Sequence, residues 1–329
     1  MCGIAGYVGK KEVPPLILDM LKKLEYRGYD SAGMSILSPK KLSVIKCKGK
    51  ISDLKKIAKL RKTDGSLSIG HTRWATHGKP SRRNAHPHLD CSKRISVVHN
   101  GIIENFKELK DKLVSEGCKF SSDTDTEVIA HLISRFYKYK GDLAGAVRKA
   151  LKELKGSYAL GVISLDEPDR IVACRRDSSL VIGVGKNENF IVSDIAAILN
   201  HTSRVIYLKD GEVAAVTKDT IDITDLCGRK VSRKVDKVSY NIKEAQLGEF
   251  PHFMLKEIHE QPRVFSRIMA HYTLPSGNIR FEGLNLTKKY FRGLDNITIV
   301  ACGTAFHAGL AGKYILESYL RIPVTVDLG

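Results

Sequence analysis

The sequence predicts an α+β protein with a strand-rich first region, its helices grouped in the middle, and a shorter α/β region after it. Three observations support this prediction. Short β-type runs recur over the first two hundred or so residues without a repeating β-α-β order. Apolar residues at three-to-four spacing, typical of amphipathic helices, gather between residues 106 and 154. The length of 329 residues favours two domains, each with a sizeable core.

The expected strands are short runs rich in β-branched and apolar residues, with turn residues between them. The early runs cover residues 3–8, 32–37, 42–48, 67–72 and 95–99. The later runs cover residues 158–164, 171–175, 181–184 and 190–193. A further pair is expected to form a hairpin around Asp210-Gly211, because Asp-Gly favours the tight turn of a two-residue loop.

Three helices are expected from the apolar periodicity, over residues 106–113, 128–136 and 143–154. The segment 124–127 has the spacing of a capping box, which places Asp125 near the start of the second helix. The apolar stripes of these helices are assigned to the core and to no chemistry.

A polar, lysine-rich stretch divides the chain into a first domain over 2–221, a linker over 222–249 and a second region over 250–329. In order, the second region is expected to hold a helix from His252, a buried strand at 297–301, a turn at Cys302-Gly303-Thr304 and a helix at 306–320. A strand, a glycine turn and a helix N-terminus present backbone N–H groups to a phosphate.

The formal net charge is +18, but the basic residues are spread along the chain and no nucleic-acid-binding motif accompanies them. We therefore expect no nucleic acid as a partner, whereas a basic surface attracts anionic metabolites such as sugar phosphates. The start of the chain lacks the pattern of a signal peptide, and no apolar run approaches the ~20 residues of a membrane span. A soluble, cytoplasmic protein is expected.

The cysteines show no C-x-x-C pair, which argues against a zinc ribbon or a disulfide framework. Reduced and mostly buried thiols are expected at Cys2, Cys47, Cys91, Cys118, Cys174, Cys227 and Cys302. The segment His86-Pro87-His88 suggests a metal site, but it lacks a helical His-x-x-x-His and an acidic partner set. No metal and no cofactor are predicted.

Cys2 carries the main chemical prediction. Removal of Met1 would leave a thiol and a free α-amine on one residue. A thiol with a pKa near ~8.5 is mostly protonated at neutral pH, and an α-amine with a pKa near ~7.7 can accept its proton. Nucleophile and base would then need no neighbouring histidine.

Four further segments share order and spacing with a known family. They are 26–33 (YRGYDSAG), 71–78 (HTRWATHG), 99–105 (HNGIIEN) and 122–127 (SDTDTE). With the N-terminal Cys-Gly-Ile, they resemble the glutaminase domain of the class II, N-terminal-nucleophile glutamine amidotransferases. The resemblance implies the four-layer αββα sandwich of the Ntn hydrolases, in which two antiparallel sheets lie between helical layers. The region after 250 resembles the first part of a sugar isomerase (SIS) domain and is expected to be an incomplete α/β domain.

The resemblance also implies roles in hydrolysis of the glutamine amide. Cys2 attacks and forms a glutamyl thioester, and the Asn100 side chain and the Gly101 N–H stabilise the oxyanion. Arg73 binds the substrate carboxylate with its two-pronged guanidinium, and Asp125 binds the substrate ammonium. Taken alone, Asn100-Gly101 would equally be a type I′ turn.

Seven further residues have supporting or second-site roles by the same resemblance. Thr76 and His77 help to bind glutamine, Trp74 closes the ammonia route, and Arg27 supports the surroundings of the nucleophile. In the second region the sugar-phosphate residues are Cys302, Gly303 and Thr304, while Ala305 stands where many family members have serine.

The implied substrates are L-glutamine and fructose 6-phosphate, with glucosamine 6-phosphate as the product and a homodimer as the full-length assembly. Family members are about twice as long as this chain, so by itself it is expected to show glutaminase activity only. Two other interpretations stay open: a phosphoribosyl-type class II amidotransferase, and a non-catalytic sugar-phosphate-sensing or nucleic-acid-binding module.

Overall fold

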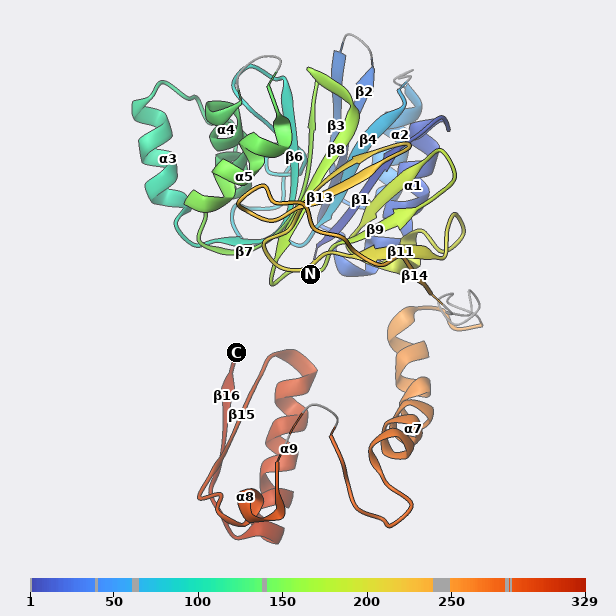
Figure 1. Cartoon of the computed structure of the whole chain (residues 1–329), viewed down its shortest axis with the longest axis vertical. Helices are drawn as coiled ribbons and strands as arrows, with labels where there is room; N and C mark the ends of the chain where they lie inside the picture. Colours follow the sequence, from blue (N-terminus) through green and yellow to red (C-terminus); the bar gives the residue numbers. More distant parts are fainter. Residues whose placement is uncertain are drawn as a thin grey trace. The chain divides into compact units, whose positions relative to one another are not determined.

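The computed structural model describes residues 2–38, 41–60, 65–137, 141–238, 249–281, 284 and 286–329. The chain forms two compact units, Met1–Phe253 and Met254–Gly329 (Figure 1). Among the described helices, none combines the length and the apolar character that crossing a bilayer requires.

The first unit contains two antiparallel sheets. The eight-stranded sheet has the order β14-β11-β9-β10-β1-β4-β2-β3. Its strands are β1 (Gly3–Val8), β2 (Ser31–Ser38), β3 (Lys41–Lys48), β4 (Leu67–Arg73), β9 (Val181–Val184), β10 (Asn189–Val192), β11 (Arg204–Tyr207) and β14 (Asp236–Lys237). The six-stranded sheet has the order β13-β12-β8-β7-β6-β5. Its strands are β5 (His88–Leu89), β6 (Ile95–Ile103), β7 (Gly156–Ser164), β8 (Glu167–Arg176), β12 (Val213–Thr217) and β13 (Ile221–Thr224).

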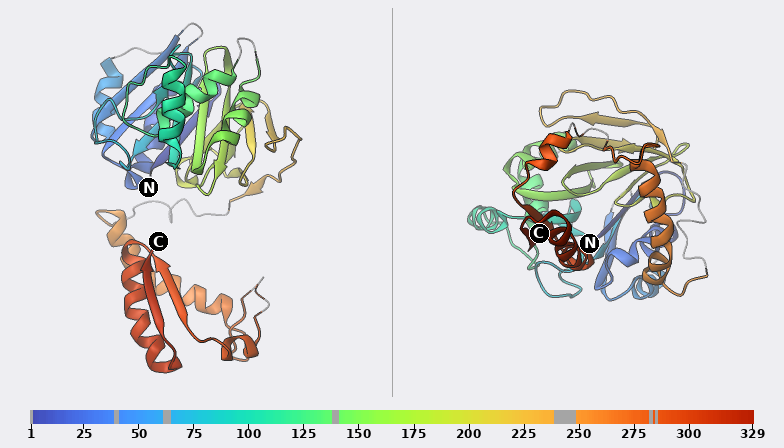
Figure 2. Two further views of the ribbon diagram at one scale, coloured as in Figure 1. Left: turned by 90° about the vertical axis from the view of Figure 1, so that its left-hand side faces the viewer. Right: turned by 90° about the horizontal axis from the view of Figure 1, so that it is seen from below.

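Helices cover the outer face of each sheet. The eight-stranded sheet is covered by α1 (Val13–Leu24) and α2 (Ile51–Leu60), and the six-stranded sheet by α3 (Phe106–Ser115), α4 (Thr126–Phe136) and α5 (Leu143–Glu153). The two helical groups lie on opposite sides of the strands (Figures 1 and 2). The expected four-layer αββα sandwich is therefore confirmed.

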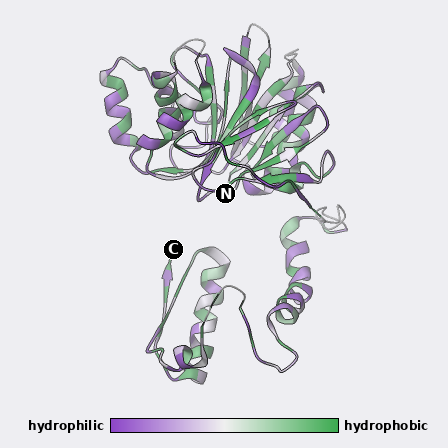
Figure 3. Cartoon of the chain, in the orientation of Figure 1, coloured by the Kyte–Doolittle hydropathy of each residue, from purple (hydrophilic) through white to green (hydrophobic). Residues whose placement is uncertain are grey.

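Three hydrophobic clusters fill the three spaces between these four layers. Strand β1 contributes side chains to two of these clusters. Ala5 and Tyr7 face the helices α1 and α2, whereas Ile4 and Val8 face the second sheet. This is the period-two alternation of a strand that is buried on both faces. Hydrophobic residues accordingly follow the inner strands, while polar residues dominate α3 (Figure 3).

Every strand and helix predicted for residues 3–193 is present, with ends that shift by up to four residues. Helices α1 and α2 are additional to the prediction, which grouped the helices in the middle of the region. Helix α1 begins with prolines at its first turn, where a missing N–H costs little, and buries Ile17, Leu21 and Leu24. The helical spacing of these apolar residues could have predicted α1 from the sequence.

The predicted hairpin around Asp210-Gly211 is wrong. A tight turn does form there, with Gly211 at φ +78° and the Glu212 N–H donating to the Lys209 carbonyl at 3.2 Å. However, β11 before the turn belongs to the eight-stranded sheet, and β12 after it belongs to the six-stranded sheet. The dipeptide determines the local turn, but the partners of each strand are chosen by distant residues.

The predicted linker over 222–249 also needs correction. Residues 221–224 form β13, which pairs with β12, and Asp236–Lys237 form β14, which pairs with β11. Both are edge strands, where lysine-rich and polar sequences are common because one side faces solvent. Residues 239–248 of the predicted linker lie outside the described part of the chain.

The second unit follows the predicted order. It comprises α7 (Phe253–Tyr272, which begins at the boundary), α8 (Lys288–Arg292), β15 (Ile297–Ala301), α9 (Gly303–Leu320) and β16 (Val324–Leu328). β15 and β16 are parallel, which confirms the α/β character. The turn predicted at Cys302-Gly303-Thr304 is shorter than expected, since α9 begins at Gly303 directly after the strand.

Candidate active site

The Cys2 thiol lies at the start of β1, against the backbone of Trp74. The Trp74 N–H donates to Cys2 Sγ at 3.3 Å, and Sγ lies 3.4 Å from the Trp74 carbonyl oxygen. This contact exists because β1 and β4 are paired, with Gly3 opposite Thr72. Burial raises the pKa of the Cys2 thiol, and the Trp74 N–H and the Arg73 charge oppose the rise without cancelling it. The resting thiol is therefore protonated and needs a base.

Asn100 projects from β6 toward the Cys2 backbone. Its side-chain N–H donates to the Cys2 carbonyl oxygen at 3.1 Å, and its oxygen lies 3.0 Å from His71 Nε2. His71 Nε2 also lies 2.9 Å from the His99 carbonyl oxygen, so Nε2 must carry the proton and donate. His71 thereby fixes the amide with its N–H groups toward Cys2.

Gly101 lies inside β6, opposite Tyr158 of β7, so Asn100-Gly101 is not a type I′ turn. Its φ is +129°, and an added Cβ would lie 2.1 Å from the Ser157 carbonyl oxygen. Only glycine fits this position.

Arg73 is almost fully buried at the end of β4, with 3% of its surface exposed. One terminal nitrogen, Nη2, donates to the carbonyls of His77 and Gly78. The other, Nη1, is buried and has no hydrogen-bond partner among the described residues. Burial lowers the pKa of Arg73, and the charges of the Asp30 and Asp125 carboxylates oppose this change. A buried cation with an unpaired donor is arranged to receive an anion.

Asp125 lies at the N-cap position of α4, as the spacing predicted. Its carboxylate does not cap the helix but accepts from the Ile103 N–H at 2.9 Å, at the end of β6. The residue expected to close the capping box, Glu127, instead accepts from the N–H groups of Ser121 and Ser122. Asp125 is therefore held between β6 and α4, close enough to Arg73 to affect its pKa.

The segment after β4 carries the other predicted glutamine-binding residues. Trp74 is exposed and packs edge-on against Tyr29, with ring centroids 5.6 Å apart. Thr76 is exposed, and His77 is half-buried with its ring against Phe106 at 5.1 Å. The His77 carbonyl accepts a hydrogen bond from Arg73. Thr76 lies near Arg73 because it is three residues away in the sequence.

Arg27 contacts the backbone of Cys2. Its Nε donates to the Cys2 carbonyl oxygen at 3.1 Å, and its Nη1 lies 3.3 Å from Asp194. The Tyr26 hydroxyl donates to the same carboxylate at 2.6 Å. Asp194 follows β10 and lies outside the matched segments. The sequence therefore gave no indication of its contact with Arg27.

His71 and Asp30 were missed although both lie within the matched segments. Asp30 accepts from the Ala75 N–H and from the Ser31 hydroxyl, which anchors the chain just after Arg73. Both residues could have been predicted as site residues from their positions in segments 71–78 and 26–33.

Four buried histidines surround the base of the site. Burial lowers the pKa of His71 to about 3 and lowers those of His86, His88 and His99. His86 and His88 contact Thr126 and Thr124 at 3.3 and 3.1 Å, so their rings have hydrogen-bond partners within the fold. They act as neutral packing and positioning groups.

The candidate sugar-phosphate residues belong to the second unit. Cys302 is the N-cap of α9, and Gly303 and Thr304 form the first turn of that helix, all of them exposed. The Cys302 thiol donates to the Gly329 carbonyl at 2.7 Å.

Comparison with known proteins finds a matching family and several similar relatives. The family described as a glutamine amidotransferase domain matches residues 71–200. The glutamine-fructose-6-phosphate aminotransferase (isomerizing) of Clostridium tetani is 49% identical over 328 residues, which is 100% of this chain and 54% of the relative. The protein of that name from Aquifex aeolicus is 47% identical, covering 99% of this chain and 53% of the relative. The chain thus spans about half the length of the curated relatives it matches.

Two solved structures share the fold. The allosteric regulatory enzyme of purine biosynthesis has a TM-score of 0.60 and 27% identity, covering 68% of this chain and 49% of that one. The glutamine phosphoribosylpyrophosphate amidotransferase of B. subtilis has a TM-score of 0.63 and 20% identity. The match covers 99% of this chain and 65% of that one. The second likeness is one of fold alone. Residues 71–200 thus match a glutamine amidotransferase domain, and the chain as a whole is similar to the curated glutamine-fructose-6-phosphate aminotransferases.

Proposed function

We propose that the first unit hydrolyses the side-chain amide of glutamine, with Cys2 as an N-terminal nucleophile. The observation that carries this proposal is the buried Arg73, whose Nη1 has no partner among the described residues, beside Cys2 and Asp125. A guanidinium and a carboxylate near a thiol match the carboxylate, ammonium and amide of glutamine.

The thiol needs a base, because its pKa is raised by burial. After removal of Met1, the α-amine of Cys2 takes the thiol proton as Sγ bonds to the amide carbon. The tetrahedral intermediate then collapses: the carbon–nitrogen bond breaks, the amine returns the proton to the leaving nitrogen, and ammonia departs. Water then cleaves the thioester and releases glutamate.

The oxyanion of each tetrahedral intermediate requires donors that are already in place. The Asn100 amide suits this role, because His71 holds its oxygen and leaves its N–H groups directed at Cys2. Substrate would then compete with the Cys2 carbonyl for one of these N–H groups. Gly101 would supply its backbone N–H, as the family resemblance implies.

For the whole protein we propose transfer of the released ammonia to fructose 6-phosphate. The support is the name of the curated relatives, together with a strand and helix N-terminus at Cys302-Gly303-Thr304 that suits a phosphate. Assembly as a homodimer stays a prediction, which light scattering of the purified protein would check.

The test uses a glutamine-like electrophile and mass spectrometry of the purified protein. We expect Met1 to be absent and a single adduct on Cys2, with labelling slowed by excess glutamine. Cys2→Ala should abolish the adduct, and the control Cys227→Ala, which removes an exposed thiol elsewhere, should retain it. An unlabelled Cys2 despite loss of Met1 would contradict the proposal and favour a non-catalytic binding module.

A further inference from the structure

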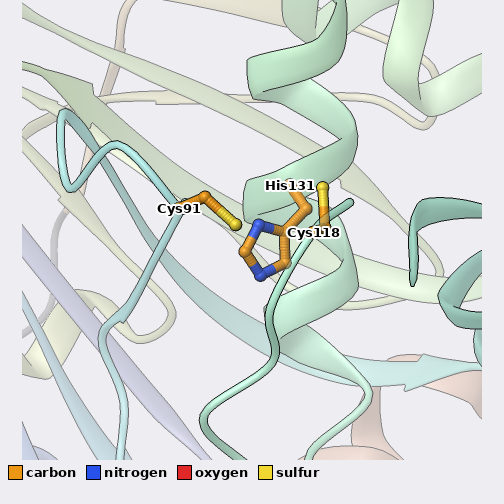
Figure 4. A group of neighbouring side chains, drawn as sticks. All are labelled: Cys91, Cys118 and His131. Carbon is orange, nitrogen blue, oxygen red and sulfur yellow. The ribbon is translucent and has the colours of Figure 1, made fainter. Parts of the chain in front are cut away.

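Three potential metal ligands from separate elements meet at the edge of the first unit, away from the catalytic residues described above. Cys91 lies in the turn between β5 and β6, Cys118 follows α3, and His131 lies in the middle of α4. Their ligand atoms all lie within 4.8 Å of one another. The side chains of Cys91 and His131 point toward one another, with Cys118 beside them (Figure 4).

His131 is a polar side chain in an almost fully buried position. Only 2% of its surface is exposed, and neither ring nitrogen has a hydrogen-bond partner among the described residues. A buried imidazole without partners is costly, so such groups usually serve a ligand, an ion or a water. The ring also packs edge-on against Phe120, with centroids 4.5 Å apart, which fixes its orientation.

Glu127 lies behind the histidine. Its carboxylate oxygen is 3.7 Å from His131 Nε2, which leaves Nδ1 as the nitrogen free for a metal ion. Hydrogen bonds from Ser121 and Ser122 hold the carboxylate. Metal-bound histidines commonly have a carboxylate on their second nitrogen, which sets the tautomer and strengthens the ligand.

The turn that carries Cys91 is fixed against α4. The buried Asp90 accepts from the N–H groups of Arg94 and Ile95, both at 2.8 Å, and from the Ser134 hydroxyl at 2.9 Å. The Cys91 sulfur accepts from the Lys119 N–H at 3.3 Å, next to Cys118. The three ligands are thus brought together by the fold before any ion binds.

We propose that Cys91, Cys118 and His131 bind a zinc ion, with a fourth position open to water or to an external ligand. Two thiolates and an imidazole are ligands that Zn²⁺ prefers, whereas Mg²⁺ and Ca²⁺ prefer oxygen. Exposure of Cys91 leaves a path for the ion and room for the fourth ligand. Binding releases the two thiol protons to solvent.

A disulfide between Cys91 and Cys118 is the competing explanation. It would account for the two sulfurs but would leave the ring nitrogens of the buried His131 without a hydrogen bond among the described residues. Zinc accounts for all three side chains and for the carboxylate behind the histidine.

The ion would tie the β5–β6 turn and the segment after α3 to α4. The N-cap of α4 is Asp125, and the segment between Cys118 and Asp125 is held by Glu127. The site would therefore stabilise the segment that positions the proposed ammonium-binding carboxylate.

The test is cobalt substitution in the reduced, chelator-treated protein. We expect one Co²⁺ per chain with a thiolate-to-cobalt charge-transfer absorption, displaced by Zn²⁺. Cys118→Ser and His131→Gln should lose most of this absorption, whereas the control Cys227→Ser should keep it, since Cys227 is exposed and outside the cluster. Cys91→Ser provides a second variant at an exposed position, where folding should be unaffected.

Thermal unfolding gives an independent readout. Zn²⁺ should raise the Tm of the wild-type chain and of Cys227→Ser, and should leave the Tm of Cys91→Ser and His131→Gln unchanged. The proposal is overturned if cobalt binds without thiolate absorption, or if the variants bind it as well as the wild type. A Cys91–Cys118 disulfide in protein purified with zinc present would overturn it too. None of these readouts depends on glutamine hydrolysis.

Discussion

Both units contain strands and helices rich in apolar residues, but they differ in how far the large side chains of these elements are buried. In the first unit, three hydrophobic clusters enclose large side chains such as Tyr7, Tyr158 and Phe190, which have no exposed surface. In the second unit, 72% of Tyr314 and 83% of Tyr319 on α9 is exposed. A strand or helix buries both of its faces only when a layer lies on each side of it, so burial depends on the number of layers and not on the apolar pattern alone.

The same contrast applies to the candidate sites. Arg73, Asn100 and Asp125 are buried, so their charges and hydrogen bonds act in a poorly solvated environment. Cys302, Gly303 and Thr304 are exposed at a helix N-terminus in the second unit. We therefore expect substitutions in the first unit to have the larger effects on stability and on glutamine hydrolysis.

The largest effect is expected for Cys2→Ala. Without the thiol no thioester forms, so glutamine hydrolysis should fall by about 10⁴-fold or more, as for other deleted nucleophiles. The matched change in the second unit, Tyr319→Ala, should leave the rate unchanged. Glutamate release measures both. A Cys2→Ala variant that retains turnover would contradict the nucleophile assignment.

The next largest difference is expected when a large aromatic side chain is truncated in each unit and the free energy of unfolding is compared. Phe190→Ala should lower the free energy of unfolding by about 3–5 kcal/mol, because it leaves a cavity between β10 and the helices. Tyr319→Ala should change it by less than about 0.5 kcal/mol, since its side chain is mostly solvated. Denaturant unfolding checks this comparison. Equal losses would show that Tyr319 is buried in solution.

Asn100→Ala tests the proposed oxyanion donor. Loss of one donor should raise the barrier by about 2.7–4 kcal/mol, which is seen in kcat more than in KM. Asn278→Ala, at an exposed position of the second unit, is the control. If kcat is unchanged while KM rises, Asn100 binds substrate and does not stabilise the transition state.

The histidine cluster predicts a pH dependence of stability. The folded-state pKa of His71 is about 3, below its ordinary value of 6.5, so folding favours the neutral ring. As the pH falls below 6.5, the unfolded chain takes up protons that the folded chain does not. The free energy of unfolding should fall by up to about 1.4 kcal/mol per pH unit for each such histidine, until the folded-state pKa is reached.

Trp74 is the single tryptophan of the chain and lies in the first unit, so its fluorescence reports unfolding of that unit. Urea unfolding followed by this signal from about pH 7 to about pH 4 measures the slope. His86→Asn, which removes one of the buried rings, should make the slope shallower. An unchanged slope would show that His86 is already charged in the folded protein.

Much of the fold could be predicted from the sequence, because helices and strands are governed by the periodicity of neighbouring residues. β1 and β15 were predicted with their observed ends. The hairpin at Asp210-Gly211 failed since a local turn does not determine which sheet each strand joins. The expectation of mostly buried cysteines failed for the same reason: of the seven, only Cys47 and Cys174 are buried.

The sequence by itself determined most of the elements, the family resemblance and the identity of the residues around Cys2, which lie in segments of recognisable order. Only the tertiary structure decided the orientation of the Asn100 amide, the unpaired Arg73 nitrogen and the meeting of Cys91, Cys118 and His131. The physical reason is that these arrangements arise from pairing and packing between residues far apart in the chain. Their hydrogen bonds and distances have no counterpart in local spacing.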